Sequence, residues 1–459
     1  MTLRNSIDTP IVAVVGFNLL TLLVFATAPV DWETHNLFQL YAFVSCCQLL
    51  ILVGFQLGHK NGPGAGRRST SMLSSGDHVM DYLFAFYAST FLVGYAYRMG
   101  FPILDIAGMY RLLLEGVRNR AFGYEMALRG TGLGPVPWTV YFLVSISNQV
   151  FFIAGSFQWK RMNSIRKLLF VIFVCIELFF SIGRGTAFGV VSVATTFFLS
   201  SMLWASSTRT QRTPGVLSSV LLVLFLFVGS IAFFSYNLYG RSGNVEMRAE
   251  LYKVGQSSVV GDHPVLSIVP EPLQPTYMNV VSYLCQGYYH TSLAFDLEFE
   301  STWLLGNNPA LISLASVIGL DVWDRTYMHR LEAEAGVDQL GSWHSAYTWY
   351  ACDVSFYGVP VVLFCLAYLF GFSWAKSARG DFLSKIMFVM FGNMLLFLFA
   401  NNTYLSTVFY SFMFLFPFWM VTRVCGLARA GALNGRPASS GASRSWRCSP
   451  MDAGTETSR

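Results

Sequence analysis

The chain has 459 residues, of which 54% are hydrophobic and only 12% are charged, and its formal net charge is +5. Soluble proteins carry roughly 25% charged residues, so this composition excludes an ordinary soluble domain and indicates an integral membrane protein. The basic residues form no stripe typical of nucleic-acid binding, and we expect no nucleic-acid partner. The eight cysteines show neither a CxxC pair nor a Cys/His ligand spacing, so we expect no disulfide and no metal site.

Apolar runs of about 20 residues recur along the chain, and a run of that length can cross a bilayer as a helix. Ten spans are predicted, at Pro10 to Val30, Leu37 to Leu57, Val79 to Arg98, Val136 to Phe157, Leu168 to Gly183, Thr186 to Ala205, Val216 to Tyr236, Ala346 to Ala375, Leu383 to Ala400 and Tyr404 to Val424. Basic residues gather in alternate connectors. The positive-inside rule therefore predicts that both termini lie in the cytoplasm.

We expect an all-α polytopic fold with one transmembrane domain, residues 1–425, and a disordered cytoplasmic tail, residues 426–459. Two long connectors, 99–135 and 236–345, fall on the outer side. In the first, Asp105 to Arg120 predicts an amphipathic helix that either lies in the membrane interface or packs on the bundle. In the second, the runs from Tyr277 to Phe295 and from Pro309 to Leu320 are interrupted or short. They predict in-plane or re-entrant helices, or a total of twelve spans if both cross.

Arginines concentrate in the outer connectors, where the positive-inside rule would place few basic residues. Arginine binds phosphate or carboxylate with two prongs, although a GC-rich genome would also raise its share. Arg184, within Ser181-Ile-Gly-Arg-Gly-Thr186, and Arg241 each stand beside glycines at a predicted membrane edge. The candidate anion-binding residues are Arg118, Arg120, Arg184, Arg241, Arg248, Arg325 and Arg330. For the last two, ion pairs with nearby carboxylates are the alternative.

Three side chains are candidates for general acid–base chemistry, namely His290, His344 and Asp353. His290 interrupts an apolar run, and His344 directly precedes the eighth predicted span. Asp353 lies about two helical turns into that span, where a carboxylate is costly and is therefore a functional candidate. A capping or hydrogen-bonded structural role is the alternative for each. No Asp-x-Asp pair occurs in an outer connector, so we expect a metal-independent reaction.

The layout of residues 1 to 425 resembles that of the Wzy-type O-antigen polymerases, also called oligosaccharide repeat unit polymerases. The resemblance rests on the hairpin from Ser181 to Thr186, the large outer loop late in the chain, and the run from Tyr347-Thr through Asp353 to Gly358. It implies a fold similar to the polyprenol-dependent membrane glycosyltransferases, in the bacterial inner membrane. It further implies transfer of a growing glycan from undecaprenyl pyrophosphate to a new lipid-linked repeat unit on the periplasmic face.

The same resemblance implies three partners, which are the undecaprenyl-pyrophosphate-linked oligosaccharide, membrane lipid and a chain-length regulator protein. It implies no cofactor. An O-antigen ligase would share this plan and differ in its acceptor, so the ligase stays open as an alternative. A transporter or flippase would instead show repeated halves with broken helices in matching positions and several midplane charges. Because the sequence shows no such repeat and its charges gather at one face, we expect an enzyme.

Overall fold

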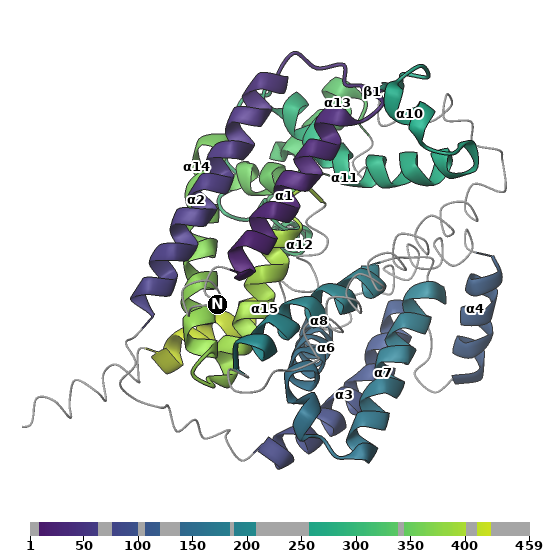
Figure 1. Ribbon diagram of the computed structural model, residues 1–459, viewed down its shortest axis with the longest axis vertical. Helices are drawn as coiled ribbons and strands as arrows, with labels where there is room; N and C mark the ends of the chain where they lie inside the picture. The colour runs from purple at the N-terminus through teal and green to yellow at the C-terminus, as the bar shows by residue number, and fades with distance from the viewer. Residues whose placement is uncertain are drawn as a thin grey trace, which may run out of the picture. The chain divides into compact units, whose positions relative to one another are not determined.

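The computed structural model describes residues 9–62, 76–99, 106–119, 138–183, 188–207, 257–337, 344–400 and 411–423. Within these ranges the chain is mostly helical, and its single sheet there has two strands (Figure 1). The chain divides into two units, Met1–Leu415 and Phe416–Arg459. The site described below belongs entirely to the first unit.

Helices occupy the positions of the predicted spans wherever the structure describes the chain. They are α1 (Thr9–Thr27), α2 (Leu37–Asn61), α3 (Gly76–Met99), α6 (Trp138–Gln158), α7 (Ser164–Gly183), α8 (Phe188–Ser207), α14 (Ala346–Ser377) and α15 (Phe382–Leu396), with residues 411–423 also helical. The predicted span 216–236 lies outside the described residues. The helical class is confirmed at these positions.

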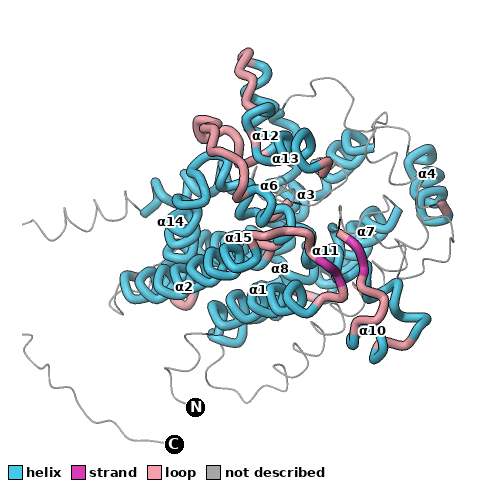
Figure 2. Tube along the Cα trace, turned by 90° about the horizontal axis from the view of Figure 1, so that it is seen from above, coloured by secondary structure: helices cyan, strands magenta, loops and turns pink. Residues whose placement is uncertain are grey.

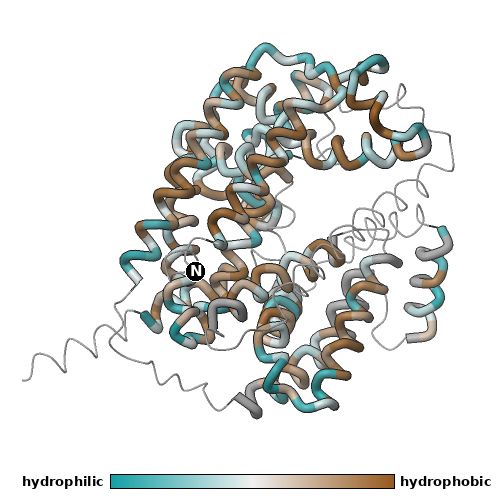
Figure 3. The backbone as a smooth tube through the Cα atoms, in the orientation of Figure 1, coloured by the Kyte–Doolittle hydropathy of each residue, from teal (hydrophilic) through white to brown (hydrophobic). Residues whose placement is uncertain are grey.

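Three of the described helices, α1, α2 and α14, are long and apolar enough to cross a membrane by length and composition. The described chain also holds two shorter apolar helical segments, Val190–Leu203 and Phe382–Leu396. Figure 3 shows the hydrophobic colouring that runs along α1 and α2. These helices indicate a membrane-embedded protein, while the total of ten spans stays a prediction.

Helices α2 and α14 lie side by side over most of their length (Figure 1), and small residues let their backbones approach closely. Gly54 and Gly58 share one face of α2, and Gly62 follows four residues later as the C-cap of the helix. A Cβ atom added to Gly58 would overlap the carbonyl oxygen of Tyr368, and one added to Gly371 would overlap that of Phe55. This is the small-xxx-small packing common between membrane helices, where dispersion contacts replace the hydrophobic effect.

Helix α14 is broken near its start. Ser355 has φ 58° and ψ 168°, values that no helix contains, and Pro360 follows five residues later. The break separates a short first part, whose residues from Ala346 to Asp353 are all buried, from a second part that continues to Ser377. The second part has 22 residues, or about 33 Å of helix, which is enough to cross a hydrocarbon core by itself.

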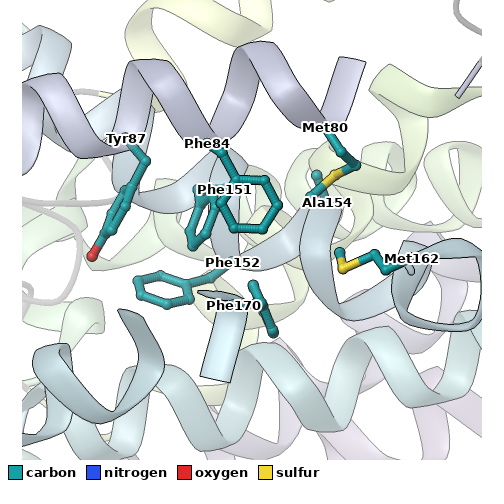
Figure 4. Packing of buried hydrophobic residues seen from close by; sticks show 8 residues of the cluster. All are labelled: Met80, Phe84, Tyr87, Phe151, Phe152, Ala154, Met162 and Phe170. Carbon is teal, nitrogen blue, oxygen red and sulfur yellow. The ribbon is translucent and has the colours of Figure 1, made fainter. Parts of the chain in front are cut away.

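Aromatic side chains join α3, α6 and α7. Tyr87 of α3 stacks on Phe151 of α6 with a centroid distance of 4.3 Å, and Phe170 of α7 lies 5.4 Å from Phe151 (Figure 4). At one end of this cluster the guanidinium of Arg166 donates two hydrogen bonds, of 2.9 and 2.7 Å, to the carboxylate of Asp81. Such a two-pronged pair fixes α7 against α3 more specifically than a single ion pair would.

The predicted amphipathic helix is present as α4 (Ile106–Arg118), and it contacts α7. That contact supports the alternative in which the helix packs on the bundle. The rest of the first connector, between residues 99 and 135, lies outside the described residues.

The second connector contains β2 (Ser258–Val259), α10 (Pro264–Ile268), η5 (Glu271–Leu273), α11 (Gln274–Ala294), α12 (Pro309–Val317), η6 (Trp323–Arg325) and α13 (Tyr327–Ala335). Strand β2 pairs antiparallel with β1 (Val30–Asp31), which follows α1, as Figure 2 shows in magenta. Helix α11 contacts α1, α2, α13 and α14. The connector therefore folds back onto the ends of the long helices.

Candidate functional site

The site forms where α11 crosses the start of α14 and the turn that follows α15. Gly287 of α11 permits this crossing, because a Cβ atom there would overlap the carbonyl oxygen of Phe399 and lie 3.1 Å from the nitrogen of Ser345. Its neighbour Tyr288 is buried, and the two hydroxyl oxygens of Tyr288 and Thr21 are 2.9 Å apart. Thr21 lies six residues before the end of α1, or about 9 Å along the helix axis. The middle of α11 therefore lies beside α1 and not beyond its end.

Three buried hydroxyl groups, which we call the hydroxyl cluster, connect α11 to α14. The Oγ1 atom of Thr291 lies 2.6 Å from the Oγ of Ser345 and 2.9 Å from the Oγ1 of Thr348. Ser345 is also the N-cap of α14, since its Oγ accepts a hydrogen bond of 3.1 Å from the backbone nitrogen of Thr348. Buried polar groups are stable only when paired, so this cluster fixes the register of α11 on α14.

Two of the three predicted acid–base residues meet beside the hydroxyl cluster. The imidazole rings of His290 and His344 have centroids 4.9 Å apart, and both side chains are buried. Burial and the neighbouring His290 hold the pKa of His344 well below its usual range. His344 is therefore neutral at physiological pH, and a neutral imidazole can accept a proton at one nitrogen while it donates from the other. We call these two residues the histidine pair.

The short segment that begins at His344 carries buried polar atoms without partners among the described residues. Both ring nitrogens of His344, the indole nitrogen of Trp349 and the hydroxyl of Tyr350 are buried, and none has a hydrogen-bond partner among the described residues. A buried polar group left unpaired costs about 1–3 kcal/mol, so several within one short segment call for an explanation. A bound molecule with many hydroxyl groups would supply the missing partners.

Asp353, the third predicted residue, anchors a neighbouring loop instead of joining the histidine pair. Its Oδ1 accepts hydrogen bonds from the hydroxyl of Thr302 and, at 2.9 Å, from the nitrogen of Gly306. Its Oδ2 accepts one of 2.6 Å from the side-chain nitrogen of Asn307. Thr302 Oγ1 also lies 2.7 Å from the carbonyl oxygen of Cys352, just before the break in α14. The geometry thus gives Asp353 a structural role, and its assignment as a base stays a prediction.

The two described arginines of the second connector differ in their surroundings. Arg330 donates a hydrogen bond of 2.6 Å to the carbonyl oxygen of Glu298 and lies 3.3 Å from a carboxylate oxygen of Glu300 and 4.0 Å from one of Glu334. The pair with Glu334 agrees with the alternative in which nearby carboxylates bind this arginine. Arg325 instead stacks on Trp303, 4.3 Å from the ring centroid, and no ion pair to a described carboxylate involves it. Of the two, Arg325 is better placed to bind an added anion.

The remaining candidate arginines are not placed at this site. Arg120, Arg184, Arg241 and Arg248 lie outside the described residues, and Arg118 is described only as the last residue of α4. Their assignment as anion-binding residues stays a prediction. Among the described residues no group of three or more His, Cys, Asp or Glu side chains could hold a metal ion.

Sequence reasoning missed Tyr350 and Thr291 as members of this site. Both lie in segments where polar or aromatic side chains interrupt an apolar run, namely Gln286 to Ser292 and Tyr347 to Tyr350. In each segment the polar groups fall on more than one helical face, so a one-dimensional pattern does not show which of them meet. The contacts of Thr291 with Ser345 and Thr348 become visible only when α11 is packed on α14.

Comparison with known proteins gives no match: no family model fits the sequence, and no curated protein or solved structure is significantly similar to it.

Proposed function

We propose that the chain is a membrane glycosyltransferase that polymerises oligosaccharide repeat units carried on undecaprenyl pyrophosphate, as its resemblance to the Wzy-type polymerases implies. The observation that carries this proposal is the set of buried polar atoms without partners at His344, Trp349 and Tyr350. A saccharide presents hydroxyl groups that both donate and accept hydrogen bonds, so it can satisfy a neutral imidazole, an indole N–H and a phenol together.

The proposed reaction needs a group that accepts a proton and a group that binds the leaving anion. A hydroxyl of the incoming repeat unit attacks the anomeric carbon of the donor glycan, so a new C–O bond forms while the bond to pyrophosphate oxygen breaks. The hydroxyl proton passes to a ring nitrogen of His344, which is uncharged and can receive it. The bonding electrons leave with the lipid pyrophosphate, whose charge a guanidinium such as that of Arg325 stabilises.

Charge placement supports an outer, periplasmic position for this site. The last turns of α2 and α14 carry Lys60 and Lys376, and η3 (Trp159–Arg161) adds further basic residues. Under the positive-inside rule these ends face the cytoplasm. The histidine pair lies at the opposite end of α14 from Lys376 and therefore faces outward. In the same scheme both termini are cytoplasmic and the membrane is the bacterial inner membrane.

The proposal is tested by the surface glycans of a strain that lacks the gene. We expect its lipopolysaccharide to show a core with one repeat unit and no ladder on a gel, and the wild-type gene to restore the ladder. A bare core with accumulated lipid-linked polymer would instead identify a ligase. An unchanged ladder would contradict the proposal.

A variant series separates the site from general damage to the protein. We expect His344→Gln to lose the ladder, because the substitution removes the proton acceptor. Gly16→Ala is the matched control, since a Cβ atom added to this exposed glycine meets nothing within 4 Å. Both variants should reach the membrane at wild-type levels. A full ladder with His344→Gln would remove the histidine pair from the mechanism.

A further inference from the structure

Helix α12 exposes large apolar side chains on the surface that faces away from the protein, beside Ser313 and Ser316, whose hydroxyls donate to carbonyl oxygens of the same helix. Val317 and Ile318, which directly follows the helix, come three and four residues after Leu314 and so lie on its side, and they are 74% and 66% exposed. Ile312 and Ala315 are buried and occupy the opposite side. A helix at a water-exposed surface normally carries polar residues on its outward side, whereas a helix that is apolar on both sides needs an apolar environment around it.

The loop before α12 exposes two more large apolar side chains. Trp303 and Leu304 are 51% and 64% exposed, and their φ values are 54° and 66°. Residues other than glycine reach this left-handed region at a cost of about 1–3 kcal/mol each, and they stay there only where the surrounding structure holds them. The three hydrogen bonds to Asp353 do so. The loop is therefore built to keep a tryptophan and a leucine on the outside.

The position of this loop connects it to the membrane-spanning part of α14. Asp353 lies two residues before the break at Ser355, and Tyr357 and Val361, just after the break, are exposed. In a helix that crosses the bilayer, exposed side chains of this kind contact lipid. The loop tip is thus fixed at the level where α14 enters the membrane.

The stacked guanidinium of Arg325 fits the same position. A tryptophan is favoured at the boundary between headgroups and acyl chains, and an arginine there covers apolar surface with its stem while its charge reaches lipid phosphates. The pair therefore matches the chemical gradient of a membrane interface. This single segment exposes a tryptophan, four aliphatic side chains and one cation. Water would not stabilise the apolar members of this set, whereas a membrane interface stabilises all of them.

We propose that Trp303, Leu304, Leu314, Val317 and Ile318 form an anchor surface that inserts into the bilayer leaflet next to the start of the spanning part of α14, with phospholipid as its occupant. The anchor surface does not depend on the reaction that the protein catalyses. It would hold the segment between α11 and α13 in the membrane surface, so that this part of the connector is interfacial and not free in the aqueous compartment.

Spin labels on the full-length protein test this proposal. The protein is reconstituted in vesicles of phosphatidylethanolamine and phosphatidylglycerol, with a nitroxide on Val317→Cys, and collisions with oxygen and with a water-soluble nickel chelate are measured. Ala333→Cys is the matched control, because Ala333 is exposed on α13 between two glutamates. The unsubstituted protein, labelled in the same way, gives the background from native cysteines.

For each label the measured quantity is the ratio of its collision rate with oxygen to its collision rate with nickel. We expect this ratio to be several-fold higher at Val317 than at Ala333. A label on Leu304→Cys should behave like the one at Val317, which tests the loop tip separately. Ready collision with nickel at Val317 would show that the surface faces water. Protection from both reagents would show that another part of the chain covers it. Either result would overturn the proposal.

Discussion

The close packing of α2 on α14 predicts a large effect of adding one methyl group at Gly58. In Gly58→Ala the new Cβ atom would overlap the carbonyl oxygen of Tyr368, which is a backbone atom and cannot rotate away. The two helices must separate locally, and overpacking of this kind costs typically 1–3 kcal/mol. Alanine favours a helix over glycine by roughly 0.5–1 kcal/mol, which offsets a part of that cost. We therefore expect a net loss of about 1–2 kcal/mol.

Gly16→Ala is the control for this substitution, since it gains the same helix propensity at an exposed site with open space around it. It should leave stability unchanged or raise it slightly. The measurement is reversible unfolding of the purified protein in mixed detergent micelles, followed by helix content. If Gly58→Ala proved as stable as Gly16→Ala, the backbone contact between α2 and α14 would be wrong, and so would the placement of the site that α14 carries.

Three further variants test the roles assigned at the site. Asp353→Ala should destabilise the protein by roughly 3 kcal/mol, because it leaves Gly306 and other buried donors unpaired. Asp353→Asn keeps an acceptor oxygen and should cost less. Equal losses of stability in the two variants would contradict the anchoring role of Asp353. Arg330→Ala should lower stability by about 1.5–3 kcal/mol, because the charged donor to the Glu298 carbonyl is lost, and thermal unfolding would show it. The pKa of His344 is depressed in the folded state, so the unfolded chain binds a proton at this residue more tightly than the folded chain does. The folded state is therefore favoured above the ordinary histidine pKa of 6.5, and this contribution to stability is lost as the pH falls below that value. His344→Gln should flatten the loss of stability between about pH 6.5 and pH 5, and an unchanged pH profile would exclude the buried neutral histidine.

The sequence predicts the long helices well because an apolar run of about 20 residues has one stable form in a bilayer. It also contains the signal for the α2 interface, since Gly54, Gly58 and Gly62 recur every fourth residue. The sequence does not show which helix packs against this face of α2. Helix α14 begins almost 300 residues later, and the apolar pattern of a helix in lipid does not indicate its neighbour. The break at Ser355 was missed for a related reason. A serine carries no intrinsic signal for a positive φ, so the sequence does not mark the break.

The site was predictable only in part. His290 and His344 were selected from the sequence as candidates, but 54 positions separate them, and their ring contact depends on the glycine at position 287 and on the hydroxyl cluster. The predicted role of Asp353 rested on the cost of a carboxylate inside a span. The first part of α14 is instead packed against protein, and three donors satisfy that carboxylate. Burial in protein and burial in lipid give the same sequence pattern.

Glycan polymerisation by the purified protein tests the proposed activity most directly. Lipid-linked repeat units are extracted from the strain that lacks the gene and are incubated with the protein in vesicles, and the products are separated by size. We expect a ladder of longer lipid-linked glycans with the wild type and with Gly16→Ala, and only single repeat units with His344→Gln. Single repeat units in every sample, from protein that is folded in the vesicles, would contradict the proposed activity.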